Sequence, residues 1–175
     1  MNTDNTSADP GITIAEWFEK GVQNFKKPDG LAAVNAFTRV IDLDPAYRHP
    51  DGDNAYFYLG KIMEVEGNIE NALVMYSRAL SIDPWDEESL IGRGSCYTVL
   101  NRAEEAIADF KQVLAIDAVH RRVPTGDIYY VIGENFRKDR NWPKALKWGR
   151  KALDEMPRND RFKQLVDEAS SRIKN

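Results

Sequence analysis

The side chains of this chain that could carry chemistry are one cysteine, two histidines and several paired carboxylates. Cys96 lies between Gly94 and Tyr97, and we expect it to be a small buried packing residue and not a nucleophile. His49 and His120 have no cysteine or carboxylate partner at the spacing that metal ligands take within one helix. The two histidines also belong to separate segments, so we expect no shared metal ion.

The acidic pairs are explained by helix structure better than by catalysis. Glu87-Glu88 and Glu104-Glu105 stand at the predicted starts of helices, where the helix dipole stabilises negative charge. The chain has no glycine-rich phosphate loop, no nucleophile elbow and no pair of carboxylates arranged for catalysis. We therefore expect a protein without enzymatic activity, without a metal and without a cofactor.

The composition restricts the kind of partner and the compartment. The 175 residues carry 24 Lys and Arg against 28 Asp and Glu, and this net charge of −4 argues against nucleic-acid binding through a basic surface. One cysteine cannot form an internal disulfide, and no run approaches the roughly 18 apolar residues that span a bilayer. The polar start of the chain lacks the features of a secretory signal. We expect a cytoplasmic protein without membrane insertion.

The segment 53–86 shows the kind of secondary structure that positions the side chains of this protein. Its apolar residues recur at intervals of three and four, which predicts two amphipathic helices and no strand. Gly60 and Ala72 are small where the two helices must approach closely. Gly67-Asn68 forms the turn between the helices, and Pro84 ends the second helix. Bulky residues fill the space between the helices, namely Tyr56, Leu59, Met63 and Tyr76.

These residue types at these spacings resemble the tetratricopeptide repeat (TPR), a 34-residue helix–turn–helix unit. The resemblance implies an all-α fold, a right-handed α-solenoid of TPR units closed by a C-terminal capping helix with a polar outer side. It implies one domain over 13–175, preceded by a disordered tail over 1–12. Four units and the capping helix are predicted over residues 14–45, 53–86, 87–118, 126–157 and 159–174.

The predicted repeats are unevenly spaced. The repeats begin at intervals of 39, 34 and 39 residues, so the first and third are five residues longer than the second. The additional residues fall within a first insert over 46–50 and a second insert over 119–124. Because such connections lie along one rim of a TPR array, both inserts should face the same way. One hypothesis makes them contacts for an acidic or phosphate-bearing partner. The alternative makes them solvated loops whose arginines donate to the last carbonyls of the preceding helices. The residues concerned are Arg48, His49, His120, Arg121 and Arg122.

The resemblance also implies a binding surface, because the first helix of each TPR unit lines a concave groove that holds a peptide. Phe18, Phe57, Ile91 and Tyr130 are expected to form an exposed apolar line in it, which is typical of an interaction site. The full set of implied peptide-binding residues is Phe18, Val22, Asn54, Phe57, Lys61, Glu64, Ile91, Ser95, Thr98, Tyr130, Glu134 and Arg137.

The groove residues favour some functions over others. Certain TPR domains hold the C-terminal carboxylate of heat-shock chaperones, but Phe18 and Val22 cannot donate hydrogen bonds to such a carboxylate. The leading hypothesis is a non-enzymatic interaction module that binds a peptide or helix of a partner protein. One alternative is a small chaperone that holds a secretion or assembly client. Another is a structural scaffold that self-assembles into a homo-oligomer.

Overall fold

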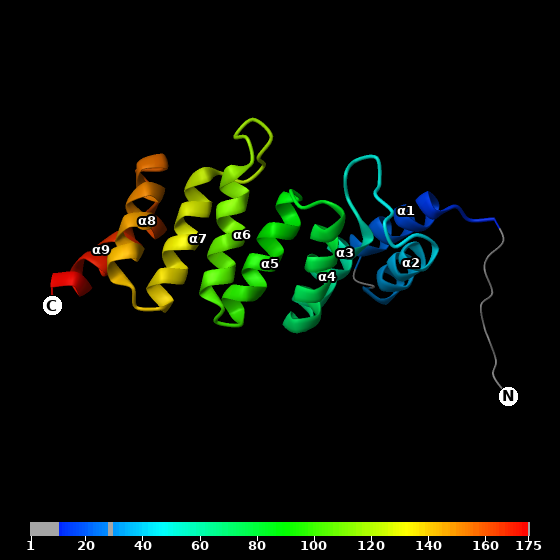
Figure 1. Cartoon of the computed structure of the whole chain (residues 1–175), viewed down its shortest axis with the longest axis horizontal. Helices are drawn as coiled ribbons and strands as arrows, with labels where there is room; N and C mark the ends of the chain where they lie inside the picture. The colour runs from blue at the N-terminus through cyan, green and yellow to red at the C-terminus, as the bar shows by residue number, and fades with distance from the viewer. Residues whose placement is uncertain (1–10, 28–29, 175) are drawn as a thin grey trace.

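The computed structural model describes residues 11–27 and 30–174, and this part of the chain contains helices and connecting turns but no strand. Most of the tail predicted over 1–12 therefore lies outside the described residues. The helices follow one another along the molecule, so that α1 and α9 lie near opposite ends (Figure 1). They are α1 (Ile14–Phe25), α2 (Gly30–Leu43), α3 (Ala55–Val65), α4 (Ile69–Ile82), α5 (Glu87–Val99), α6 (Ala103–Ala115), α7 (Thr125–Lys138), α8 (Trp142–Glu155) and α9 (Asp160–Lys174).

The helices pack in sequential order, which confirms the predicted all-α solenoid. Within each repeat, an odd-numbered helix packs against the even-numbered helix that follows it, as α3 does against α4. Between repeats, each even-numbered helix packs against the next odd-numbered one, as α4 does against α5. Two helices with one apolar face each cannot bury those faces alone, so stacking of the pairs creates the continuous core.

The helix ends follow from local sequence. A capping box starts α1: the backbone N–H of Glu16 donates to Thr13 Oγ1 over 3.2 Å, and the Thr13 N–H donates to Glu16 Oε2 over 2.6 Å. Gly67, Asn101 and Arg140 stand in equivalent turns between the two helices of a repeat, and all have positive φ. Such a residue stops a helix by turning the backbone into the left-handed region.

Glycines allow the helices of a repeat to approach closely, as the sequence predicted for Gly60. A Cβ atom at Gly60 would lie only 2.8 Å from Cε1 of Tyr76, and one at Gly94 would lie 2.9 Å from Cε1 of Phe110. The other side of the Tyr76 ring faces Gly92 in the following repeat, where a Cβ would also clash with the ring. Tyr76 therefore fixes the distance between two neighbouring repeats.

The last helix, α9, closes the C-terminal end of the core. Phe162, Leu165 and Ala169 on one face are buried, whereas the opposite face is polar. Leu165 also fills the space beside Gly133, where a Cβ would lie 2.8 Å from its Cδ2 atom. The helix therefore covers apolar surface that the fourth repeat would otherwise expose to water.

Candidate functional site

A groove pocket lies between the first helices of the second and third repeats, α3 and α5. It encloses a volume of about 250 Å³. Five of its eight lining residues are positions that the family resemblance placed on the concave groove, and they come from both helices. The lining residues are Phe57, Lys61, Glu64, Glu88, Ile91, Gly92, Ser95 and Val123.

The groove pocket is lined by charged residues of both signs and by apolar residues. Lys61 Nζ lies 3.5 Å from Glu64 Oε2, and the same carboxylate accepts a hydrogen bond of 2.6 Å from the Tyr76 hydroxyl. On the α5 side, burial raises the pKa of the Glu88 carboxyl, although the nearby Arg122 guanidinium acts in the opposite direction. The pocket could therefore take an apolar side chain and pair polar groups beside it.

The expected exposure of Phe18 is wrong, since this side chain is only 1% exposed. The first insert folds back over α1, and the His49 imidazole stacks on the Phe18 ring at 4.9 Å between centroids. Tyr47, also from this connection, and Tyr58 of α3 lie against the same ring. The insert therefore covers the groove at the first repeat, and Val22 packs against the core there.

The other three members of the expected apolar line differ in exposure. Phe57 is 9% exposed and packs against Tyr58, so only part of its surface reaches the groove pocket. Ile91 is half-buried and lines the pocket. Tyr130 stacks on Phe162 of α9 at 5.0 Å between ring centroids. The line is therefore interrupted, and its accessible part lies at the groove pocket.

Asn54 and Thr98 face the protein interior and not the groove. Asn54 is 1% exposed and caps α3, because its Oδ1 accepts a hydrogen bond of 3.0 Å from the Phe57 N–H. Its Nδ2 has no hydrogen-bond partner. The Thr98 hydroxyl lies 3.0 Å from Asn135 Oδ1. Neither side chain is free to bind a peptide in this arrangement.

Glu134 and Arg137 form a fixed ion pair on α7. The Arg137 guanidinium donates hydrogen bonds of 2.9 and 2.8 Å to the two Glu134 carboxylate oxygens, and it lies 3.7 Å from Glu168 of α9. Hydrogen bonding to the Glu134 carboxylate raises the pKa of Arg137. The pair ties α7 to the capping helix, and binding to a peptide would have to compete with these contacts.

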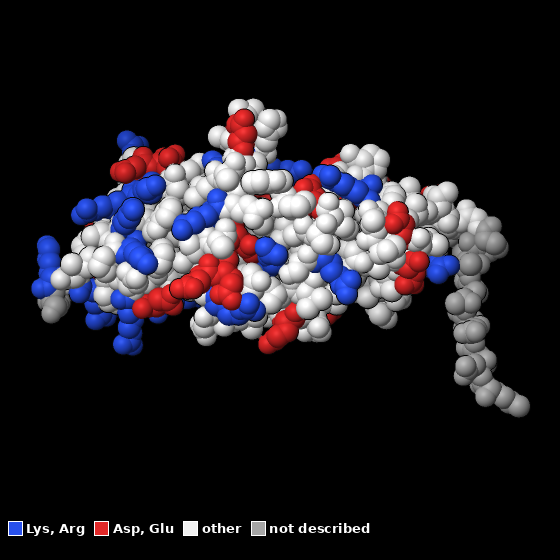
Figure 2. Space-filling view, viewed as in Figure 1, with Lys and Arg blue, Asp and Glu red and all other residues white. Residues whose placement is uncertain are grey.

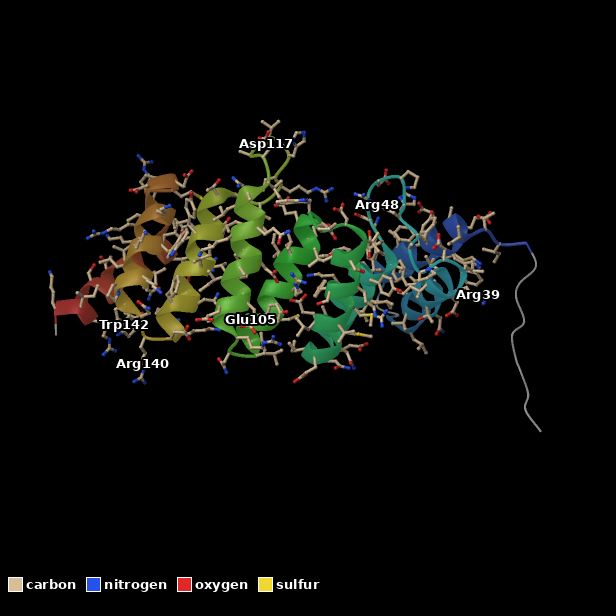
Figure 3. All side chains as sticks on the ribbon, in the orientation of Figure 1. Arg39, Arg48, Glu105, Asp117, Arg140 and Trp142 are labelled. Carbon is tan, nitrogen blue, oxygen red and sulfur yellow. The ribbon has the colours of Figure 1, made fainter. Side chains whose placement is uncertain are left out.

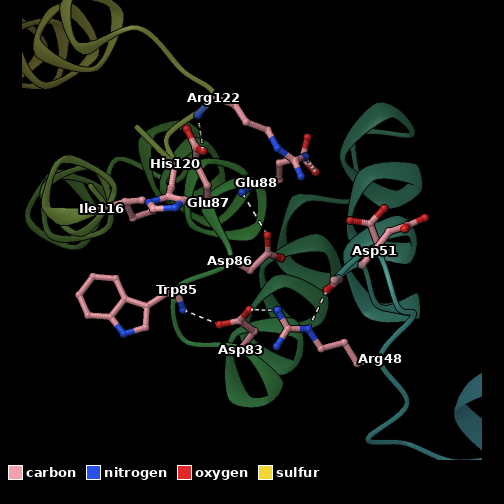
Figure 4. Close-up of a pocket in the computed structure, with 12 residues that line it drawn as sticks. Arg48, Asp51, Asp83, Trp85, Asp86, Glu87, Glu88, Ile116, His120 and Arg122 are labelled. Carbon is pink, nitrogen blue, oxygen red and sulfur yellow. Dashed lines mark hydrogen bonds and ion pairs between the residues drawn. The ribbon is translucent and has the colours of Figure 1, made fainter. Parts of the chain in front are cut away.

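The two inserts lie on the same rim of the solenoid, as expected. Arg48 and Asp117 mark the two connections on one side of the molecule, opposite Glu105 and Arg140 (Figure 3). Residues of both connections line a rim cleft of about 220 Å³ (Figure 4). The rim cleft is lined by Arg48, Asp51, Gly52, Asp53, Asp83, Trp85, Asp86, Glu87, Glu88, Ile116, His120 and Arg122.

The charge of the rim cleft opposes the hypothesis of an anionic partner. Six carboxylates line it against two guanidinium groups, and both guanidinium groups are already paired. Arg48 contacts Asp83 at 2.5 Å, and Arg122 lies 3.5 Å from Glu88. Burial raises the pKa of Asp86, which makes the ionised form of this carboxyl more costly in the rim cleft.

The remaining basic residues of the inserts serve the loops themselves. Arg121 donates hydrogen bonds to the carbonyls of Leu114 and Val123, over 3.4 and 3.2 Å. The contact with Leu114 agrees with the hypothesis that the inserts are solvated loops, in which an arginine donates to carbonyls at the end of the preceding helix. The His49 nitrogens lie 3.2 Å from Glu19 and 3.3 Å from Asp51. The fifth residue of this set, His120, is exposed at the rim cleft.

Sequence reasoning missed the role of Glu87, which it explained by the helix dipole. The Glu87 carboxylate is buried and accepts hydrogen bonds of 2.8 Å from the backbone N–H groups of Arg122 and Val123. It thereby fixes the second insert against the start of α5. Its partners are 35 and 36 residues away in the chain, so no local pattern in the sequence could have indicated the contact.

The described residues offer neither a cluster of metal ligands nor a helix that could span a membrane. Within 11–27 and 30–174, no group of three His, Cys, Asp or Glu side chains is placed to hold a metal ion. None of the helices of this part is long and apolar enough to cross a membrane.

Comparison with curated proteins places the chain among repeat proteins. A family model described as tetratricopeptide repeat matches residues 87–120. The chain is 26% identical over 117 residues to a UDP-N-acetylglucosamine–peptide N-acetylglucosaminyltransferase of Giardia intestinalis. It is 27% identical over 144 residues to a probable transferase of the same kind, SPINDLY, of Petunia hybrida. These matches cover 62% and 75% of this chain but only 8% and 15% of the two relatives.

Solved structures share the fold at low sequence identity. A MamA protein superposes with a TM-score of 0.72 at 21% identity, over 92% of this chain and 88% of that one. A tetratricopeptide repeat protein from Parabacteroides merdae superposes with a TM-score of 0.74 at 23% sequence identity. The match covers 90% of this chain and 60% of that one. The first TPR of Spaghetti (RPAP3), bound to an HSP90 peptide, superposes with a TM-score of 0.60 at 18% sequence identity. The match covers 69% of this chain and 91% of that one. The family model thus finds a tetratricopeptide repeat at residues 87–120, and solved TPR structures share the fold of the chain.

Proposed function

We propose that this protein is a non-enzymatic interaction module that binds a peptide or helix of a partner protein in the groove pocket between α3 and α5. The observation that carries the proposal is the composition of this pocket. Two adjacent repeats contribute predicted groove positions to one cavity of about 250 Å³, with Phe57 and Ile91 as apolar surface and Lys61, Glu64 and Glu88 as polar groups. An apolar anchor within a polar rim is the usual arrangement of a peptide site.

The covering of Phe18 restricts where a ligand can lie. Because the first insert occupies the groove at α1, the accessible groove runs over the second to fourth repeats. A ligand would place an apolar side chain in the groove pocket and reach charged groups on either side of it. Lys61 and Glu64 offer one charge of each sign, which favours a ligand that carries both.

The RPAP3 structure supports peptide binding by this fold, since that TPR holds an HSP90 peptide. We do not expect the same ligand here. Phe18 and Val22 lie in the core of the first repeat, Asn54 is a buried helix cap, and Lys61 is paired with Glu64. These side chains do not form a set of donors that could hold a terminal carboxylate.

The test is to fill the groove pocket without changing the outer surfaces. Ser95→Phe places a large ring in the cavity, and Ser81→Phe on α4 introduces the same side chain at an exposed position outside it. Proteins captured by the wild type would be identified and purified, and their affinities for the wild type and for both variants measured by calorimetry. We expect Ser95→Phe to weaken binding about tenfold or more, and Ser81→Phe to leave it unchanged. Equal binding by all three proteins would refute the proposal.

A further inference from the structure

The charges of this chain are strongly segregated along its length. Residues 137–175 contain 12 of the 24 Lys and Arg but only 6 of the 28 Asp and Glu, so this part has a net charge of +6. Residues 1–136 carry the other 12 basic and 22 acidic residues, a net charge of −10. Figure 2 shows basic side chains gathered over the C-terminal helices. The small total of −4 therefore conceals two surfaces of opposite sign.

The positive charge is concentrated on α8. Between residues 140 and 153 the chain has five basic and no acidic residues. Four of them, Lys144, Lys147, Arg150 and Lys151, are exposed on α8, and we call this set the α8 basic face. None of the four makes an ion pair among the described residues. The charge of this face is therefore uncompensated within one molecule.

Aromatic rings, and not carboxylates, position two of these lysines. Lys144 Nζ lies 5.1 Å from the centroid of the Phe136 ring. Lys151 Nζ lies 5.0 Å from the Trp148 ring and 5.1 Å from the Tyr129 ring. A cation–π contact orients an ammonium group but leaves its charge intact. The α8 basic face thus presents ordered, unneutralised charge to an incoming acidic surface.

The rim cleft, at the junction of the two inserts, is an acidic feature of the described surface. Its six carboxylates face only two guanidinium groups, which leaves a local excess of negative charge. The Trp85 side chain, 56% exposed, stands at its edge and offers apolar surface to a partner. An approaching cation would relieve the repulsion among these carboxylates.

One molecule cannot bring these two surfaces together. In Figure 1 the rim connections and α8 lie in different parts of the solenoid, and no ion pair joins α8 to the rim cleft in the described part of the chain. At physiological ionic strength the Debye length is about 8 Å, so each surface acts locally and the net charge of the molecule matters little. Both surfaces are therefore available to a second molecule.

We propose that the α8 basic face docks on the acidic rim cleft of a second copy of this chain. The contact joins two different surfaces and so leaves one free basic face and one free cleft at the ends of each assembly. Such a heterologous contact produces open chains, or rings where the rotation closes. The basic face lies outside the groove pocket, whereas the rim cleft shares Glu88 with it.

The test uses two charge-reversal variants of the full chain. The face variant carries Lys144→Glu, Lys147→Glu and Lys151→Glu, and the cleft variant carries Asp51→Lys, Asp53→Lys and Asp83→Lys, which lie outside the groove pocket. A control variant carries Lys26→Glu, Lys27→Glu and Lys111→Glu, which gives the same change in net charge as the face variant at exposed positions elsewhere. Circular dichroism would establish that all variants keep their helices. Molar mass would be measured by light scattering and sedimentation over a range of protein concentrations, at about 0.1 M and 1 M NaCl.

We expect the mass of the wild type and of the control variant to rise with concentration at about 0.1 M salt, and to fall towards the monomer at about 1 M. The face variant and the cleft variant should each remain monomeric, with a dissociation constant raised about tenfold or more. An equimolar mixture of these two variants should assemble again, because the reversed face of one now complements the reversed cleft of the other.

Two results would overturn this inference. One is a wild type that stays monomeric at both salt concentrations, including one that binds vesicles of anionic lipid through α8 instead. The other is a mixture of the face and cleft variants that fails to assemble although each is folded and the wild type assembles. Neither result would bear on the groove pocket, which the Ser95→Phe variant tests separately.

Discussion

The imidazole of His49 stacks on the ring of Phe18, with 4.9 Å between the centroids and 9° between the planes. This contact joins an insert to the first helix and closes the groove over the first repeat. It also explains why a family pattern that fits the second and third repeats fails at the first one. The insert brings its own aromatic surface, and burial of Phe18 beneath it removes apolar area from water.

Removal of this stacking contact should destabilise the first repeat. We expect His49→Ala to lower the free energy of unfolding by about 1 kcal/mol, which is typical of an aromatic pair beyond its buried area. His120→Ala is the matched control, because His120 is exposed on the other insert. Urea unfolding followed by circular dichroism measures both changes. An equal loss in the two variants would contradict a specific role of His49.

The buried carboxylate of Glu87 should be needed to hold the second insert in place. Glu87→Gln replaces one of two acceptor oxygens by an NH₂ group that faces a backbone N–H, which should cost about 1–3 kcal/mol. The loop should open more often, so that trypsin cleaves after Arg121 or Arg122 faster than in the wild type. Glu88→Gln serves as the control. Unchanged cleavage in Glu87→Gln would show that the loop is held by other contacts.

Tyr76 and Gly92 should be energetically coupled across the boundary between two repeats. A Cβ at position 92 would clash with the Tyr76 ring, so Gly92→Ala should lower the free energy of unfolding by about 1–3 kcal/mol. The same substitution in a Tyr76→Ala background should cost much less, because the ring is gone. A double-mutant cycle measured by urea unfolding gives the coupling energy. Additive effects would mean that the backbone adjusts around the new methyl group.

The thiol of Cys96 should be unreactive in the folded protein. Burial raises its pKa to about 11, so at pH 8 only about one molecule in a thousand carries the reactive thiolate. The rate of reaction with a thiol reagent should rise about tenfold for each pH unit between 8 and 10, as the thiolate fraction does. The same reaction in concentrated urea provides the rate of the exposed thiol. Equal rates at pH 8 with and without urea would contradict this prediction.

Much of the fold and part of the groove could be predicted because both depend on local patterns. The spacing of Gly60 and Tyr76 within one repeat predicted their close packing. Lys61, Ile91 and Ser95 line one pocket, because helix periodicity determines which residues share a face.

The expectations for Phe18 and Asn54 failed for different physical reasons. Phe18 has the sequence signature of a groove residue, but its burial depends on how the first insert folds. Counting positions along the repeat places Asn54 in the groove. The helix α3 begins one residue later, at Ala55, and Asn54 serves as its N-cap. A connection outside the repeat pattern thus decided the burial of Phe18, whereas a local helix cap fixed Asn54.

By itself, the sequence determined the helices, their pairing and the concave positions, because the periods of three and four and the small residues between helices are local properties. The tertiary structure alone decided which of those positions remain open and what charge the rim carries. The inserts suggested a basic rim through Arg48 and Arg122. Folding brings carboxylates from two separate segments, 51–53 and 83–88, around these arginines and reverses the sign. Charge at a surface is a sum over neighbours in space, and most of these neighbours are distant in the chain.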